Sequence, residues 1–283
     1  MKLNEMIRQH GLDEREEHQL REYIKNRYES TQPPFENSSE LIKPFKSLAA
    51  MAQLFGAAEI INKKLCPAHP VSYRDPDSVR LEIYDSFAGE IPVIYAGNSA
   101  DFEALVTNIV NKGVRNESIS STGASFVYGK SVRFLIVSAK PYSNVSAAEL
   151  GLDDEEWHKK SMQIRLSHEC THYFTKQEYG ISENNLHDEL MADFTGIYNA
   201  FGFYRAEWFL RFMGIISGGG SRFSVYTGGL CKKAAGAAAD ITVQAAACLE
   251  KWSETENFRK LTDAERIRLM CRLGIEGMLE GSF

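Results

Sequence analysis

Apolar and polar positions follow a helical spacing over the first quarter of the chain. Residues 3–29 have this helical spacing and many charged residues, and they end at the helix-breaking sequence STQPPFENSS. A second stretch, residues 38–64, begins with serines that can cap a helix and places Pro44 near its first turn, where proline does least harm. The pattern therefore predicts one helix over 3–29 and another over 38–64.

The spacing changes to that of β-strands between residues 69 and 139. SVRLEIYDS alternates polar with apolar residues, IPVIYA is a short apolar strand, and SADFEALVTNIVNKG is typical of a serine-capped helix. The run ASFVYGKSVRFLIVSAK contains two β-rich stretches joined at Gly129-Lys130, which predicts a β-hairpin. We expect its second strand, residues 131–139, to form the edge of the sheet, where an extended peptide could add as a further strand.

After Pro141 the helical spacing returns. The predicted helices are 157–178, 185–200, 203–216, 229–251 and 262–279. The glycine-rich stretch SGGGSRFSVYTGG is typical of a flexible linker. The predicted fold class is α+β, and the three expected regions are a helical N-terminal region (1–66), a mixed α/β lobe with the β-hairpin (67–180) and a mainly helical lobe (181–283).

Composition narrows the classes of partner. The 283 residues are 43% hydrophobic and carry a net charge of -6, so they offer no overall basic surface for nucleic acid. The first 20 residues lack the apolar core of a secretory signal, and no apolar run approaches the about 18 residues of a membrane span. We therefore expect a cytoplasmic protein with no nucleic-acid or membrane partner. Five scattered cysteines without a CxxC pair predict reduced thiols.

The sequence SHECTH contains the strongest chemical signal. His168 and His172 stand four residues apart, so on a helix they lie one turn apart on the same face and can direct their rings at one metal ion. Glu169 lies about 100° further round the helix axis. That position places its carboxylate beside the metal, where it can accept a proton from water, as in the HExxH signature of zinc hydrolases.

A third ligand is needed, because catalytic zinc usually has three protein ligands and one open position. The sequence ENNLHDELMADFTG predicts a helix start at Asn185, followed by Glu189 and Asp193 four residues apart on one face. Glu189 is the expected ligand, and Asp193 is expected to accept the free ring N–H of a ligand histidine. His187 and Asp188 remain alternative third ligands.

HECTH followed by ELMAD resembles the gluzincin metallopeptidases, which carry HExxH and then ExxxD on a separate helix. The ExxAD form is similar to soluble relatives of the HtpX and CAAX-protease group. The resemblance implies a thermolysin-like arrangement, in which a mixed α/β lobe precedes the HExxH helix and a helical lobe follows. It also implies Zn²⁺ bound by His168, His172 and Glu189, with Glu169 as general base. Asp193 would accept the ring N–H of a ligand histidine. A metzincin would need Gly and His where this chain has Thr175 and Glu178.

The expected activity is hydrolysis of peptide bonds in a peptide or protein substrate, with Glu169 passing a proton from water to the leaving amine. The donor to the oxyanion stays open among Tyr179, His187, Arg222 and Tyr226. The alternative is a regulatory or interaction protein that zinc stabilises and that has little or no catalytic activity. The sequence leaves cleavage specificity and oligomeric state undetermined.

Overall fold

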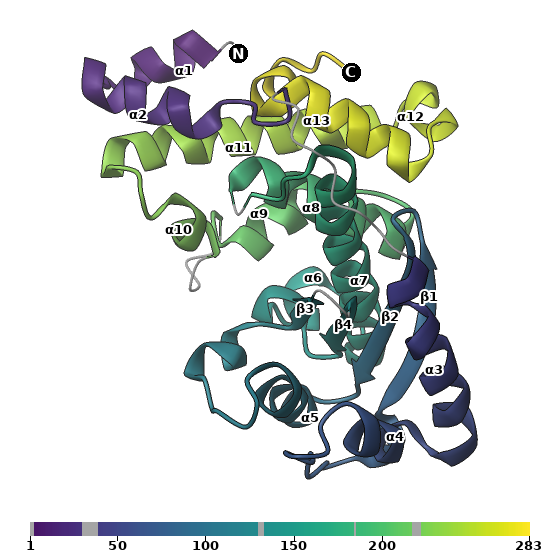
Figure 1. The fold of residues 1–283 in the computed structure, drawn as a ribbon. Helices are drawn as coiled ribbons and strands as arrows, with labels where there is room; N and C mark the ends of the chain where they lie inside the picture. Colours follow the sequence, from purple (N-terminus) through teal and green to yellow (C-terminus); the bar gives the residue numbers. More distant parts are fainter. Residues whose placement is uncertain (1–2, 30–38, 130–132, 184, 217–221) are drawn as a thin grey trace. The chain divides into compact units, whose positions relative to one another are not determined.

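The computed structural model describes residues 3–29, 39–129, 133–183, 185–216 and 222–283 (Figure 1). It is a mixed α+β protein in which helices predominate. Its contacts define two compact units, Glu36–Glu169 and the combination of Met1–Phe35 with Cys170–Phe283. The division falls inside helix α7 (Asp154–Tyr179), which carries the HECTH sequence.

The unit Glu36–Glu169 contains a four-stranded sheet in the order β1-β2-β4-β3. The strands are β1 (Arg80–Ser86), β2 (Gly89–Ala96), β3 (Ala124–Tyr128) and β4 (Arg133–Ser138). β1 and β2 are the strands expected from SVRLEIYDS and IPVIYA, and they pair antiparallel. β2 pairs parallel with β4, and β4 pairs antiparallel with β3. The antiparallel β3–β4 pair confirms the strands of the expected hairpin, whereas the expected turn at Gly129-Lys130 falls partly on residues 130–132, which lie outside the described residues.

The prediction that residues 131–139 form a sheet edge was wrong. β4 lies between β2 and β3, and all six of its residues are buried. An uninterrupted apolar run such as FLIV is typical of a strand covered on both faces, because an edge strand with one wet face alternates apolar with polar residues. The edges of the sheet are β1 and β3, and most residues of β3 are half-buried.

Helices pack beside this sheet around a core that includes Phe45, Ile61, Leu105 and Ile136. The helices of the unit, besides α7, are α3 (Lys43–Phe55), α4 (Ala57–Lys64), α5 (Ser99–Leu105) and α6 (Ala147–Leu150). Short 3-10 turns cover Ser39–Leu41, Pro76–Ser78, Glu117–Ser121 and Tyr142–Asn144, and a π-turn over Val106–Val110 continues α5. The cap of α5 is Asn98, not the expected serine: its side chain accepts a hydrogen bond from the Asp101 amide.

The second unit is helical. Its helices, after the end of α7, are α1 (Leu3–Gln9), α2 (Glu14–Ile24), α8 (Leu186–Phe201), α9 (Ala206–Met213), α10 (Arg222–Thr227), α11 (Lys232–Ser253), α12 (Glu256–Lys260) and α13 (Asp263–Glu280). α11 and α13 lie side by side, and α2 runs along α11 (Figure 1). Part of the expected glycine-rich linker is therefore helix α10, while residues 217–221 lie outside the described residues.

Glycines divide both long helices that the spacing predicted. Gly11 has a φ of 56° between α1 and α2, and Gly56 has a φ of 89° between α3 and α4. Asp13 then caps α2 with a capping box that includes Glu16.

No helix of the described residues combines the length and the apolar character that crossing a membrane requires.

Candidate metal centre

Helix α7 presents the two histidines. Its start is stabilised by Asp153, whose side chain accepts hydrogen bonds from the amides of Glu155 and Glu156. Acidic residues in the first turn also complement the positive end of the helix dipole. His168 is buried and His172 is partly exposed, with 16% of its side chain accessible.

Helix α8 presents the carboxylates. Asn185 caps its start as predicted, with a side chain that accepts a hydrogen bond from the Asp188 amide at 3.0 Å. Glu189 and Asp193 then lie one turn apart and are almost completely buried, with 2% and 0% exposed. Burying two carboxylates is costly unless cations and hydrogen bonds compensate, so their surroundings indicate what the site can bind.

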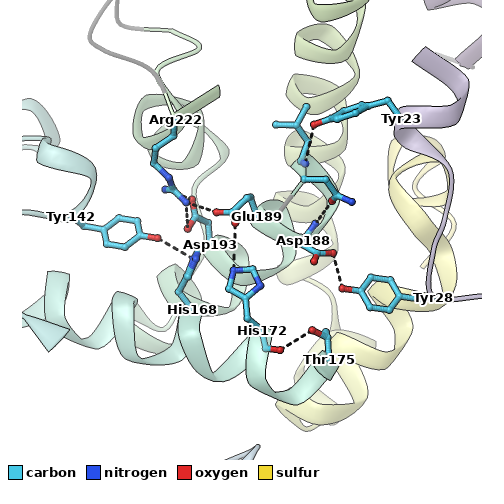
Figure 2. Close-up of polar contacts among 12 residues, drawn as sticks. Tyr23, Tyr28, Tyr142, His168, His172, Thr175, Asp188, Glu189, Asp193 and Arg222 are labelled. Carbon is cyan, nitrogen blue, oxygen red and sulfur yellow. Dashed lines mark hydrogen bonds and ion pairs between the residues drawn. The ribbon is translucent and has the colours of Figure 1, made fainter. Parts of the chain in front are cut away.

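His168, His172 and Glu189 come together as a possible set of metal ligands (Figure 2). One ligand atom from each lies within 4.8 Å of the others. The closest measured pair is His172 Nε2 and Glu189 Oε1, at 3.4 Å. Two atoms that each lie about 2.0–2.1 Å from one tetrahedral zinc ion are about 3.3–3.4 Å apart. The donor types and this spacing both fit zinc.

Arg222 of α10 reaches the carboxylates from the other side (Figure 2). Its Nη2 lies 2.6 Å from Glu189 Oε2, and its Nη1 lies 2.9 Å from Asp193 Oδ2. The guanidinium therefore forms ion pairs with both acids. The sequence suggested Arg222 as a donor to an oxyanion, and the structure places it against the expected ligand Glu189. The bond from Asp193 to a ligand imidazole stays a prediction.

Tyr142 is a functional candidate that sequence reasoning missed. Its hydroxyl lies 3.0 Å from Nδ1 of His168, and the two rings meet edge to face with centroids 6.2 Å apart. Tyr142 lies just after β4, 26 residues before the histidine, and no spacing rule links the two positions. The only sequence signal is its place in PYSN, directly after the strand and before the histidine helix.

Residues 57–132 and 130–280 match a family of unknown function (DUF7005). The chain belongs to this family. The DUF7005 match over 130–280 includes Tyr142, both histidines, Glu189 and Arg222, so the whole candidate site lies in one matched stretch. Neither a curated protein nor a solved structure matches the chain.

The two alternative third ligands have other partners in this DUF7005 chain. Asp188 accepts a hydrogen bond from the Tyr28 hydroxyl at 2.6 Å, and burial raises its pKa to about 7. The His187 ring lies 3.2 Å from the carbonyl of Met270, and burial lowers its pKa to about 4. Neither belongs to the cluster that could hold a metal.

The remaining oxyanion candidates divide between two places. Tyr179 packs edge-on against Tyr28, with ring centroids 5.1 Å apart, and burial raises its pKa to about 12. Tyr226 lies beside Arg222, whose guanidinium is 5.8 Å from the centre of its ring. Burial raises the pKa of Tyr226 as well, so both phenols keep their protons at neutral pH.

Glu169, the base expected from the sequence, has few polar contacts of its own. It follows His168 on α7 and is half-buried. Within the part of the chain that the structure describes, its carboxylate makes no hydrogen bond or ion pair. Its neighbour Cys170 is completely buried and does not belong to the cluster. Glu169 therefore has a carboxylate whose charge is not already committed to another side chain.

Proposed function

We propose that this protein is a zinc-dependent hydrolase that cleaves peptide bonds, with an arrangement similar to that of the gluzincins. The observation that carries the proposal is the convergence of His168, His172 and Glu189 to within 4.8 Å. Glu169 supports it further, because a site that only stabilises a fold does not require a carboxylate beside the first histidine.

The charges at the site favour a bound cation. Glu189 and Asp193 together carry two negative charges in a buried place, and the Arg222 guanidinium supplies one positive charge. The group therefore has a net charge of -1 when both acids are ionised. A divalent cation beside Glu189 would compensate this charge, and nitrogen and carboxylate donors suit zinc.

The residues of the chain then divide the work. His168, His172 and Glu189 would hold the ion, and bound zinc supplies an acidified water and a polarised carbonyl. Glu169 accepts a proton from the attacking water and passes it to the leaving amine. Arg222 and Tyr226 lie on the carboxylate side of the cluster and are the nearest candidates to donate to an oxyanion, whereas Tyr179 and His187 pack against Tyr28.

One contact favours a second candidate function. Arg222 forms ion pairs with Glu189 and Asp193, and these pairs can stabilise the fold without any catalysis, as expected of a structural metal site. The second candidate is therefore a zinc-stabilised regulatory or interaction protein with little catalytic activity.

Zinc content tests the site itself. Protein purified without added metal should contain close to one zinc per chain by elemental analysis, and His172→Ala should lose most of it. His18→Ala is a matched control, because His18 is exposed on α2 and should leave the zinc content unchanged. Equal zinc in the wild type and His172→Ala would contradict the proposal.

Glu169→Gln separates the two candidate functions. A hydrolase should keep its zinc and lose about 100-fold or more of its activity on a peptide mixture, because a positioned base contributes on that scale. Glu156→Gln changes an exposed acid of the same helix and should retain activity. Zinc-containing wild type without activity on any peptide pool would favour the stabilised, non-catalytic protein.

A further inference from the structure

One face of helix α7 binds the segment that follows strand β4. Trp157 donates from Nε1 to the carbonyl of Val145 at 2.8 Å, and Ser161 Oγ accepts from the amide of Tyr142 at 2.9 Å. Arg165 and His168 continue this face toward the metal cluster, since the four residues are spaced by three or four positions. The helix that carries the ligand histidine therefore also fixes the segment that carries Tyr142.

Arg165 provides most of the attachment. Its side chain is buried, and its guanidinium donates to the carbonyls of Ser138, Lys140 and Pro141. The same guanidinium lies 5.4 Å from the centre of the Tyr142 ring. Charged donors make strong hydrogen bonds in buried surroundings, so three carbonyls in four residues hold this backbone firmly.

Tyr142 is 5% exposed, and its hydroxyl ends 3.0 Å from His168 Nδ1. Neutral imidazole has one nitrogen that carries a proton and one that carries a lone pair. A hydroxyl that accepts from Nδ1–H leaves the lone pair on Nε2, which can then bind a metal. A hydroxyl that donates to Nδ1 leaves the proton on Nε2, and neither nitrogen is then available.

We propose that Tyr142 is the positioning residue of the metal centre: its hydroxyl accepts a hydrogen bond from Nδ1–H of His168 and so presents the Nε2 lone pair to the metal. This inference rests on the proposed metal site. The partner of the other ring nitrogen of a metal-binding histidine is often a carboxylate or a carbonyl. A phenol orients the ring in the same way without adding a negative charge. The attachment through Ser161 and Arg165 sets the ring orientation before any metal binds.

Zinc affinity tests the role of the hydroxyl. Tyr142→Phe keeps the ring and should weaken zinc binding about 10–100-fold in a competition titration of the full chain against a chelating dye. Tyr73→Phe is the matched control, because the buried Tyr73 hydroxyl has no hydrogen-bond partner among the described residues. The control should bind zinc like the wild type. Equal affinity in Tyr142→Phe and wild type would overturn the inference and leave the proposed site intact.

Nitrogen NMR of the zinc-free wild type gives a readout that does not depend on any variant folding. With ¹⁵N-labelled histidine, and with the His168 signals assigned from a His168→Gln sample, we expect the proton on Nδ1. A proton found mainly on Nε2 would overturn the inference. Wild type that takes up no zinc would instead overturn the proposed function, and the positioning role with it.

Discussion

The two carboxylate oxygens of Glu189 face different partners. Oε1 lies 3.4 Å from His172 Nε2, and Oε2 lies 2.6 Å from Arg222 Nη2. Arg222 therefore occupies one oxygen and leaves the other on the side of the histidines. We expect Glu189 to contribute a single oxygen to the metal, which preserves an open position for water.

Loss of Glu189 and loss of Asp193, the two acids of α8, should affect zinc binding differently. Glu189→Ala removes a proposed ligand and should nearly abolish zinc binding, whereas Asp193→Asn keeps the shape of the side chain and should weaken binding about 10–100-fold. Zinc titrations of both variants give the comparison. If Asp193→Asn lost zinc outright while Glu189→Ala retained it, the roles of the two acids would be reversed.

The sequence was enough to predict the site residues that share one face of a helix. His168 and His172, or Glu189 and Asp193, lie one turn apart, so their shared faces follow from spacing alone. Tyr142 lies 26 residues from His168, and Arg222 lies 29 and 33 residues from the two acids it bonds, so only the folded chain brings these side chains close. The sequence contains no periodic signal for such contacts.

At the scale of elements, helix α10 stabilises the two buried acids of the candidate site through Arg222. Replacing Arg222 by Met should lower the free energy of unfolding of the zinc-free protein by about 1–3 kcal/mol, because two buried carboxylates lose a charged donor. Urea unfolding in the presence of a chelator measures this. Arg268→Met is the control: Arg268 forms an exposed pair with Glu178, and its loss should cost about 0–1 kcal/mol. Equal costs for the two variants would show that α10 does not stabilise the site.

The break between α1 and α2 should depend on Gly11. Its φ of 56° lies in the left-handed region, and a Cβ there would meet no atom within 4 Å. Gly11→Ala should therefore cost about 1–2 kcal/mol through backbone conformation alone. Gly229→Ala also adds a Cβ in open space, at a glycine without a positive φ, and should change stability little. Thermal unfolding of the two variants side by side distinguishes conformation from contact.

Element types were easier to predict than their limits and neighbours. The apolar spacing continues across Gly11 and Gly56, so it predicted single helices where the backbone turns. The strand FLIV was recognised, but its central place depends on parallel pairing with β2. Each paired residue of β2 lies 42 residues earlier in the chain than its partner in β4. The sequence signal of this long-range pairing is the uninterrupted apolar run of the strand, which is typical of a strand buried on both faces.

At the scale of the whole molecule, burial divides the five cysteines. Cys66, Cys170 and Cys271 are buried, and burial raises the pKa of the Cys66 and Cys271 thiols; Cys231 and Cys248 are partly exposed. The thiolate is the reactive form, so a thiol reagent should modify two cysteines quickly in the folded protein and all five in denaturant. A Cys231→Ser, Cys248→Ser double variant should show no fast phase. Rapid modification of Cys170 would contradict this burial pattern.

During synthesis, helices α1 and α2 leave the ribosome long before α11 and α13, the helices against which they pack. His10 bonds Asp240, and Asn26 bonds the carbonyl of Cys271, across 230 and 245 residues of sequence. At about 5–20 residues per second, the N-terminal helices wait roughly 10–50 s for these partners. All residues of the unit Glu36–Glu169 are synthesised before these partners. We therefore expect the apolar faces of α1 and α2 to stay uncovered in the nascent chain until α11 and α13 have been synthesised.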